Sequence, residues 1–208
     1  MTGSPTPDDL ESRHAQKMRK RKAARDRMMA TKTDERGLLI VHTGPGKGKT
    51  SAALGMVFRH LGHGMPVGVV QFIKSAARDT GEARLLARFP DVVSLHVMGE
   101  GFTWETQDRA RDVAAARAAW EQAKRLIRDE RLRFVLLDEL NIVLRYDYLP
   151  LDEVLAFLRD GRPPDTHVVV TGRNAAPALI ELADLVTEMT LVKHPFREGV
   201  KAQRGIEY

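Results

Sequence analysis

The sequence predicts an α/β fold, in which a mainly parallel sheet of six strands lies between two layers of helices. Two observations support this prediction. From residue 37 onward, short apolar runs alternate with longer segments of helical periodicity, a pattern typical of parallel sheets covered on both faces. In addition, a glycine-rich loop follows the first apolar run directly, as in folds that bind phosphate where a strand leads into a helix.

The individual elements follow from apolar periodicity and from the glycine and proline residues between them. Strands are predicted at 37–42, 67–73, 92–97, 133–138, 166–171 and 185–191, and helices at about 49–62, 80–88, 107–130, 150–160 and 175–183. The buried face of the longest of these helices is marked by Val113, Ala116, Trp120, Ala123 and Ile127. In open sheets of this kind, ligands bind at the carboxyl ends of the strands.

The chain divides into an N-terminal extension, residues 1–36, and a single ligand-binding domain, residues 37–208. Residues 1 to about 9 are small or polar for the most part and are predicted to form a flexible tail. A helix is then predicted from Leu10 to about Ala30. Its apolar stripe is thin, so we expect a marginally stable helix that docks on the rest of the protein only part of the time.

The amino-acid composition is that of an ordinary globular protein without cysteine chemistry. Hydrophobic residues make up 43% and charged residues 29% of the chain, and cysteine is absent. Disulfides, thiolate zinc sites and iron–sulfur clusters are therefore excluded, and any electron that the chemistry needs must come from elsewhere. No apolar run is long enough to cross a membrane and the N-terminus is too polar for a signal peptide, so we expect a cytoplasmic protein without a membrane partner.

The formal net charge is +5 and the pI is about 9.6, values that are compatible with a nucleic-acid partner. Much of the basic excess lies between Arg13 and Arg36, a segment without Phe, Tyr or Trp for base stacking. A small polyanionic ligand explains the charge equally well, and we expect no nucleic-acid partner.

The most informative motif is the glycine-rich loop at 43–50 (TGPGKGKT), which follows the apolar run 38–41. Its three glycines leave backbone N–H groups free to converge on phosphate oxygens, and the helix that follows adds its positive N-terminus. Lys49 is predicted to neutralise phosphate charge, and the Thr50 hydroxyl to bind the accompanying Mg²⁺. Thr43 stands where such loops usually have glycine, but the remaining spacing still allows a tight anion-binding turn. The predicted nucleotide-binding residues are Thr43, Gly44, Pro45, Gly46, Lys47, Gly48, Lys49, Thr50 and Ser51.

A second motif, Phe134 to Glu139, is an apolar strand that ends in two acidic residues. A carboxylate at a buried strand end can reach the Mg²⁺ beside a triphosphate, so Asp138 and Glu139 are candidate metal ligands together with Thr50. Many ATPases use a Glu at this place to activate water. The motif by itself also allows a strand that simply ends in a polar turn.

Two further segments are unusual in composition. The segment Gly99–Gln107 follows a predicted strand and contains Phe102 and Trp104. Loop aromatics often pack back on the core, but at the carboxyl end of a strand they can instead line a ligand pocket. The C-terminal segment Lys193–Tyr208 is rich in polar side chains, and we expect it to dock on the domain.

A set of motifs is distributed along the chain: the loop at 43–50, the segments 69–74 (VVQFIK), 101–107 (GFTWETQ), 137–141 (LDELN), 146–151 (YDYLPL) and 171–173 (TGR), and the C-terminal segment. Taken together, these motifs resemble the P-loop corrinoid adenosyltransferases, of the cob(I)yrinic acid a,c-diamide adenosyltransferase type, over residues 35–208. Pro45 stands where the family often has Asn, which removes one possible backbone donor to the nucleotide, and Ser51 stands where a second Thr is common.

The resemblance implies a three-layer RecA-like P-loop fold and a specific reaction. ATP would give its 5′-deoxyadenosyl group, rather than a phosphoryl group, to Co(I) of a corrinoid and release triphosphate, in the biosynthesis and salvage of adenosylcobalamin. Lys49 would stabilise the charge on the departing triphosphate. Thr50 and Glu139 would hold Mg²⁺, with Asp138 supporting them.

The family's aromatic residues at the lower face of the corrin match Phe102 and Trp104. There they would displace the axial ligand of Co(II) and exclude water, which makes the reduction to Co(I) easier. The predicted catalytic residues are thus Lys49, Phe102, Trp104 and Glu139. The resemblance also implies an external reductant, a reduced flavoprotein, together with a lid role for the N-terminal helix and a homodimer.

Other classes of function compete with this reading of the sequence. A RecA-like ATPase would keep the P-loop and use Glu139 to position water, but it has no need of the loop that contains Phe102 and Trp104. A small-molecule kinase would need an acceptor-binding lid with arginines, which the sequence does not indicate. A binding module without catalysis explains neither the aromatic loop nor a docked C-terminal segment.

Overall fold

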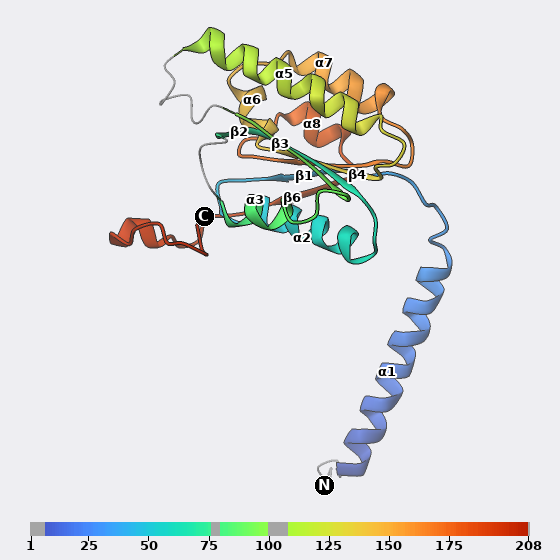
Figure 1. Cartoon of the computed structure of the whole chain (residues 1–208). Coiled ribbons are helices and arrows are strands. Elements are labelled where there is room, and N and C mark those ends of the chain that lie inside the picture. Colours follow the sequence, from blue (N-terminus) through green and yellow to red (C-terminus); the bar gives the residue numbers. More distant parts are fainter. Residues whose placement is uncertain (1–6, 76–79, 100–107, 208) are drawn as a thin grey trace. The chain divides into compact units, whose positions relative to one another are not determined.

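The computed structural model describes residues 7–75, 80–99 and 108–207. The chain forms two compact units, residues 1–35 and 36–208, and the larger unit contains a six-stranded sheet with helices on both faces (Figure 1). Among the described helices, none combines the length and the apolar character needed to cross a membrane.

Helix α1 (Pro7–Ala30) makes up most of the smaller unit. It includes the predicted helix but begins at Pro7, so the predicted tail was wrong for residues 7–9; residues 1–6 lie outside the described part of the chain. Proline is tolerated in the first turn of a helix, and Asp8 and Asp9 interact favourably with the positive N-terminus. No residue of α1 is buried, in keeping with its thin apolar stripe.

The sheet of the larger unit is parallel throughout. Its strands have the order β3-β2-β4-β5-β1-β6, and every pair of neighbours is parallel, so the prediction of a mainly parallel six-stranded sheet is confirmed. Because parallel strands end at one edge of a sheet, the loops that follow them gather there. The strands are β1 (Leu39–Thr43), β2 (Val67–Ser75), β3 (Val93–Gly99), β4 (Phe134–Asp138), β5 (His167–Thr171) and β6 (Leu185–Glu188).

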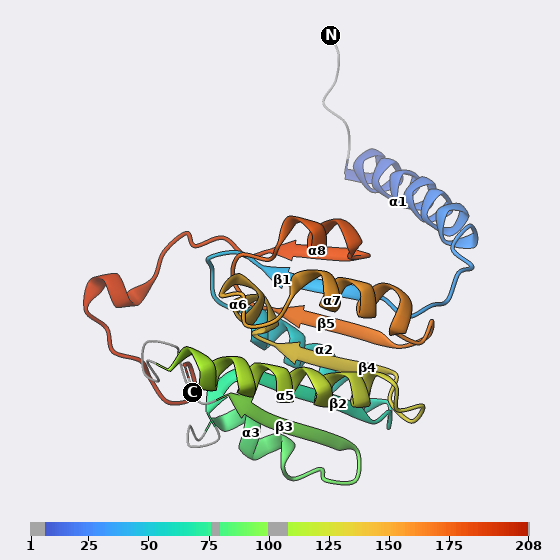
Figure 2. The same cartoon turned by 90° about the horizontal axis from the view of Figure 1, so that it is seen from above.

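Helices cover both faces of this sheet. Figure 1 shows α5, α6, α7 and α8 on one face and α2 and α3 on the other, and Figure 2 shows α5 lying along the sheet near β2 and β4. The bounds are α2 (Lys49–Gly62), α3 (Gly81–Leu86), α5 (Arg109–Ile127), α6 (Leu140–Arg145), α7 (Leu151–Ala156) and α8 (Pro177–Leu182).

Strand β4 contributes side chains to the cores on both faces of the sheet. Val135 and Leu137 belong to the core under α5 to α8, while Phe134 and Leu136 belong to the core against α2. Side chains alternate between the two faces of a strand, so a strand that is covered on both faces must be apolar at every position. This requirement explains the continuous apolar run that the sequence shows before Asp138.

Helix α5 packs on the sheet through the face that its sequence predicts. Ala116, Trp120, Ala123 and Ile127 are buried, and Val113 is partly buried against the same core. The Trp120 ring meets the Phe157 ring edge to face at 5.4 Å between centroids. Its indole N–H donates a hydrogen bond to Glu153 Oε1 at 3.2 Å, so the polar atom of this buried ring is satisfied.

Three elements differ from their predicted form. Helix α6 was not predicted, because a six-residue helix is too short to show a helical period. The predicted helix at 150–160 consists of α7 and a turn of π-helix, η1 (Phe157–Gly161). Strand β6 was predicted to reach residue 191 but ends at Glu188, because β1, its neighbour at this edge, ends at Thr43 and leaves no strand to pair with.

The imidazole rings of His60, in α2, and His167, in β5, lie close to each other. Their rings are 6.0 Å apart, and the His60 ring also packs on Phe134 at 4.5 Å. The Nδ1 atom of His167 accepts a hydrogen bond from the Leu38 N–H at 3.1 Å, which requires that nitrogen to be unprotonated. Burial lowers the pKa of His167 from 6.5, and the nearby charges of His60 and Arg162 lower it further.

We predict that acidification destabilises the fold through His167. Since its pKa is lower in the folded than in the unfolded chain, the unfolded chain binds more protons below pH 6.5, and the free energy of unfolding falls as the pH drops from there toward the folded pKa. The His167→Gln variant keeps a hydrogen-bond acceptor but does not titrate. Urea unfolding between pH 7.5 and 5.5 should show a smaller loss of stability in this variant, whereas an equal loss in both proteins would contradict the prediction.

Candidate active site

The glycine-rich loop joins β1 to α2 as predicted, and two of its glycines have a left-handed backbone. The φ angle is 95° at Gly44 and 104° at Gly48, values that residues with a side chain rarely adopt. Gly46 is required by close approach instead, because a Cβ atom there would lie 2.5 Å from the Thr190 carbonyl oxygen. The glycines therefore allow both the tight turn of the loop and the close packing of the segment after β6 against it.

Lys49 lies inside this loop. Its side chain is buried, and its Nζ atom donates hydrogen bonds to the Gly44 carbonyl at 2.8 Å and to the Gly46 carbonyl. Burial lowers the pKa of Lys49, the charge of Arg173 lowers it further, and the carboxylate of Glu139 acts in the opposite direction. The ammonium is thus held where an anion that enters the loop can bind it.

Asp138 is fully buried at the end of β4 and accepts hydrogen bonds from three other elements. Its Oδ1 atom accepts from the hydroxyls of Thr50, at 2.8 Å, and Thr171, at 2.7 Å. Its Oδ2 atom accepts from Gln71 Nε2 at 3.2 Å and lies 3.3 Å from Lys74 Nζ. The structure therefore brings the predicted residues Thr50 and Asp138 together, and it adds three partners.

Glu139 follows Asp138 with a left-handed backbone, at a φ of 65°. Its N–H donates a hydrogen bond to Thr171 Oγ1 at 2.9 Å, which holds this conformation. Burial raises the pKa of Glu139 and the adjacent Asp138 raises it further, while Lys49, Lys74 and Arg173 act against the rise. The pKa of Glu139 is thus raised chiefly because its carboxylate is removed from water.

These residues fit a magnesium ion. Thr50 donates its hydroxyl hydrogen to Asp138, which leaves lone pairs of the Thr50 oxygen for a cation, and Glu139 adds a carboxylate. Both are hard oxygen ligands of the kind that Mg²⁺ prefers. Within the described ranges no three His, Asp or Glu side chains converge as a metal site, so an ion here would need water and phosphate oxygens as further ligands.

Residues that the sequence analysis left without a role complete the site. Lys74 pairs with Glu82 at 3.1 Å as well as with Asp138. Burial acts to lower the pKa of Lys74, but the charges of the two carboxylates outweigh it and raise the pKa. The signal for Gln71, Lys74 and Thr171 was their place at the ends of strands that neighbour β4.

The other predicted nucleotide-binding residues differ in their surroundings. Pro45 and Ser51 are exposed, and Lys47 forms an ion pair with Glu207. Thr43 is buried, and its hydroxyl accepts a hydrogen bond from the Ala175 N–H at 3.0 Å, so its side chain ties the loop to the chain after β5. The predicted residues Phe102 and Trp104 lie in 100–107, outside the described residues.

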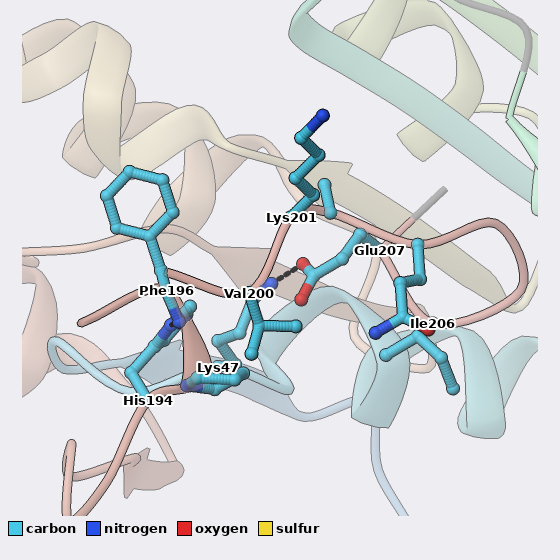
Figure 3. A pocket seen from close by; sticks show the side chains of 10 residues that line it. Lys47, His194, Phe196, Val200, Lys201, Ile206 and Glu207 are labelled. Carbon is cyan, nitrogen blue, oxygen red and sulfur yellow. Dashed lines mark hydrogen bonds and ion pairs between the residues drawn. The ribbon is translucent and has the colours of Figure 1, made fainter. Parts of the chain in front are cut away.

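The chain after β6 contacts the glycine-rich loop at two places. Directly after β6, the Met189 N–H donates to the Thr43 carbonyl at 2.9 Å and the Met189 carbonyl accepts from the Gly46 N–H at 2.7 Å. The chain then forms a 3-10 turn, η2 (Pro195–Glu198), and returns so that Glu207 meets Lys47 (Figure 3). The ion pair with Lys47 attaches the far end of the segment to the loop, docking of the rest of the segment stays a prediction, and Tyr208 lies outside the described residues.

Comparisons with known proteins point to one family. The family model described as ATP:corrinoid adenosyltransferase BtuR/CobO/CobP matches residues 35–208, and the model described as cob(I)alamin adenosyltransferase N terminal matches residues 1–29. A corrinoid adenosyltransferase of Sinorhizobium sp is 64% identical over 199 residues, which cover 95% of this chain and 92% of that protein. A corrinoid adenosyltransferase of Pseudomonas aeruginosa is 58% identical over the full length of both chains.

A third relative extends the same likeness to lower identity. The corrinoid adenosyltransferase CobA of Salmonella typhimurium is 48% identical over 198 residues, which cover 95% of this chain and 99% of that protein. The family model spans the sheet, the glycine-rich loop and the Asp138 site together. This chain belongs to the ATP:corrinoid adenosyltransferase family.

Proposed function

We propose that this protein transfers the 5′-deoxyadenosyl group of ATP to the Co(I) ion of a corrinoid and releases inorganic triphosphate. The cobalt electron pair forms the new Co–C bond, and the C5′–O bond breaks with its electron pair on the triphosphate. The observation that carries the proposal is the 2.8 Å bond from Thr50 to Asp138, which joins a phosphate-binding loop to a carboxylate edge in a chain of this family.

The residues at the loop would act on the leaving group. Lys49 and the loop N–H groups would stabilise the negative charge that grows on the triphosphate as the C5′–O bond breaks. Thr50 and Glu139 would hold Mg²⁺, which when bound neutralises part of that charge, while Asp138 orients the Thr50 hydroxyl. A hydrolysing RecA-like ATPase would share these residues, but the similar proteins are named corrinoid adenosyltransferases, which does not favour hydrolysis.

The order of the strands supports a site for a large second substrate. Strand β3, which leads into the segment with Phe102 and Trp104, lies four strand spacings from β1 in the sheet. At roughly 4.8 Å per spacing, the two strand ends are about 19 Å apart along the sheet edge, which leaves room for a broad planar ring beside the phosphate site. We propose that Phe102 and Trp104 displace the lower axial ligand of Co(II) there and so promote its reduction.

Several parts of the proposal rest on the resemblance to the family. The electron would come from a reduced flavoprotein, since the chain has no cysteine for redox chemistry of its own. Helix α1 would serve as a lid over the corrinoid. The protein would act as a homodimer in the cytoplasm, without a nucleic-acid or membrane partner.

Product analysis tests the reaction directly. The protein is incubated with ATP, Mg²⁺ and chemically reduced cobalamin, and the products are separated by chromatography. We expect adenosylcobalamin and triphosphate in equal amounts, because one bond is broken for each bond formed. Release of ADP and orthophosphate without adenosylcobalamin would instead support an ATPase.

We predict that Lys49→Ala lowers turnover by about 100-fold or more, because it removes a preorganised cation from the leaving group. Lys124→Ala is a matched control, since Lys124 on α5 pairs with Glu121 at 2.7 Å and has no place in the site. Turnover of adenosylcobalamin is measured for both variants at saturating Mg²⁺. Normal turnover in Lys49→Ala would remove the loop from the mechanism.

The double variant Phe102→Ala, Trp104→Ala should distinguish reduction from alkyl transfer. With Co(II) corrinoid and reductant we expect activity to fall at least about tenfold more than with preformed Co(I), because only the first assay needs the axial ligand to leave. The two assays are run on the same protein preparation. Equal losses in both would mean that the aromatic pair does not assist reduction.

A further inference from the structure

The side chains that hold Asp138 divide between its two oxygens according to the element they come from. The Oδ2 atom meets two side chains of β2, since Gln71 Nε2 donates to it at 3.2 Å and Lys74 Nζ lies 3.3 Å away. The Oδ1 atom accepts from the hydroxyls of Thr50 and Thr171. The β2 pair therefore anchors one oxygen and leaves the other turned toward Thr50, one of the residues that fit a magnesium ion.

Strand β2 is irregular at the place where it carries this pair. From Gln71 to Ser75 it advances by four residues, while the paired part of β3 advances by two. The neighbours Phe72 and Ile73 both belong to the core under α5 to α8, which the alternation of a regular strand does not allow. Gln71 and Lys74 can therefore reach the same carboxylate oxygen. Irregularities of this kind often lie beside active sites, where they redirect a side chain.

Lys74 is held from its other side by Glu82, in the first turn of α3. Its Nζ atom donates to Glu82 Oε1 at 3.1 Å, so the ammonium lies between two carboxylates. The start of α3 is fixed in turn by the buried N-cap Thr80, whose hydroxyl accepts a hydrogen bond from the Ala83 N–H at 3.3 Å. Lys74 is thus a fixed donor to Asp138 and not a freely moving surface side chain.

The orientation of Asp138 decides where the Thr50 hydroxyl directs its hydrogen. With Oδ2 anchored, Oδ1 accepts that hydrogen at 2.8 Å, and the lone pairs of the Thr50 oxygen point elsewhere. Thr50 lies in the first turn of α2, where a hydroxyl without this acceptor can bond instead to a backbone carbonyl of the preceding turn. Such a rotation would take the oxygen away from the metal that it is proposed to bind.

We propose that Gln71 and Lys74 are positioning residues for the complex of metal and nucleotide. By anchoring Oδ2 of Asp138 they orient its Oδ1 atom, and through that atom the Thr50 hydroxyl whose oxygen would bind Mg²⁺. The inference rests on the proposed function, because it takes Mg-ATP as the ligand. Neither positioning residue needs to touch the nucleotide. Replacement of residues behind a metal ligand typically lowers metal affinity by about 10- to 100-fold.

A simple effect of charge has to be separated from positioning. Mg-ATP carries a net negative charge, so loss of the Lys74 ammonium weakens its binding through electrostatic attraction alone. That loss does not depend on the Thr50 hydroxyl, whereas the positioning effect does. Gln71 is uncharged, so its replacement tests positioning without a change in charge.

A double-mutant cycle makes the separation. Binding of ATP in excess Mg²⁺ is measured by calorimetry, without corrinoid, for the wild-type protein, Lys74→Met, Thr50→Val and the double variant. We expect Lys74→Met to weaken binding about tenfold when Thr50 is present, and about twofold or less in Thr50→Val, which has no hydroxyl to orient. Lys74→Arg, which keeps a charged donor, should restore most of the affinity.

The Gln71→Met variant extends the test without removing a charge. We expect it to weaken ATP binding in Mg²⁺ but not in EDTA, because without a metal the Thr50 oxygen has no ligand to bind. The loss in Mg²⁺ should again be small in the Thr50→Val background. Circular dichroism checks the fold of each variant, and Gln71→Met carries the test by itself if Lys74→Met does not fold.

A matched control lies on α5. Lys124 is 21% exposed against 24% for Lys74, and it too lies near two carboxylates, those of Glu121 at 2.7 Å and Glu153 at 3.8 Å. It has no place in the site, so Lys124→Met should bind Mg-ATP as the wild-type protein does.

Several results would overturn the inference. They are an equal cost of Lys74→Met with and without the Thr50 hydroxyl, wild-type affinity of Gln71→Met in Mg²⁺, an equal loss for Gln71→Met in Mg²⁺ and in EDTA, and wild-type binding of ATP that does not depend on Mg²⁺. The proposed reaction fails separately, if the wild-type protein binds Mg-ATP but forms no adenosylcobalamin. That result would leave the positioning role in place.

Discussion

The buried carboxylate of Asp138 is the interaction on which the site depends. A carboxylate that leaves water loses several kcal/mol of solvation, so it is stable in the core only with a full set of donors. Here the hydroxyls of Thr50 and Thr171 share one oxygen, and Gln71 and Lys74 share the other. These donors come from β2, α2 and the end of β5, so a single charge sets the spacing of three neighbouring strand ends and the loop.

A second constraint acts on the glycine-rich loop from behind. The backbone after β6 lies so close that a Cβ atom at Gly44 or Gly46 would fall 2.5 Å from a carbonyl oxygen. The same backbone bonds to the loop through Met189. These contacts hold the loop in its curled form, and preorganised donors of this kind act on a leaving group without a cost of rearrangement.

The two constraints act at different places along the edge of the sheet where the strands end. The centre, around β2 and β4, contains the two acids and the Lys74 cation that set the local charge. The β1 side supplies the glycine-rich loop and the segment after β6 that bonds to it. The β3 side leads into the aromatic segment, four strands away from the loop. An edge of this breadth can place two substrates side by side, which a transfer between a nucleotide and a large metal complex requires.

The amino-acid sequence by itself determined the α/β class, the six parallel strands, the buried face of α5 and the loop from Thr43 to Thr50. These features follow from short-range periodicity and local spacing, which act within about ten to twenty residues. Only the tertiary structure decided that Gln71 and Thr171, 67 and 33 residues from Asp138, meet on its carboxylate, and that the segment after β6 closes a cavity beside Lys47. Such contacts depend on the order of strands in the sheet, and no local pattern encodes that order.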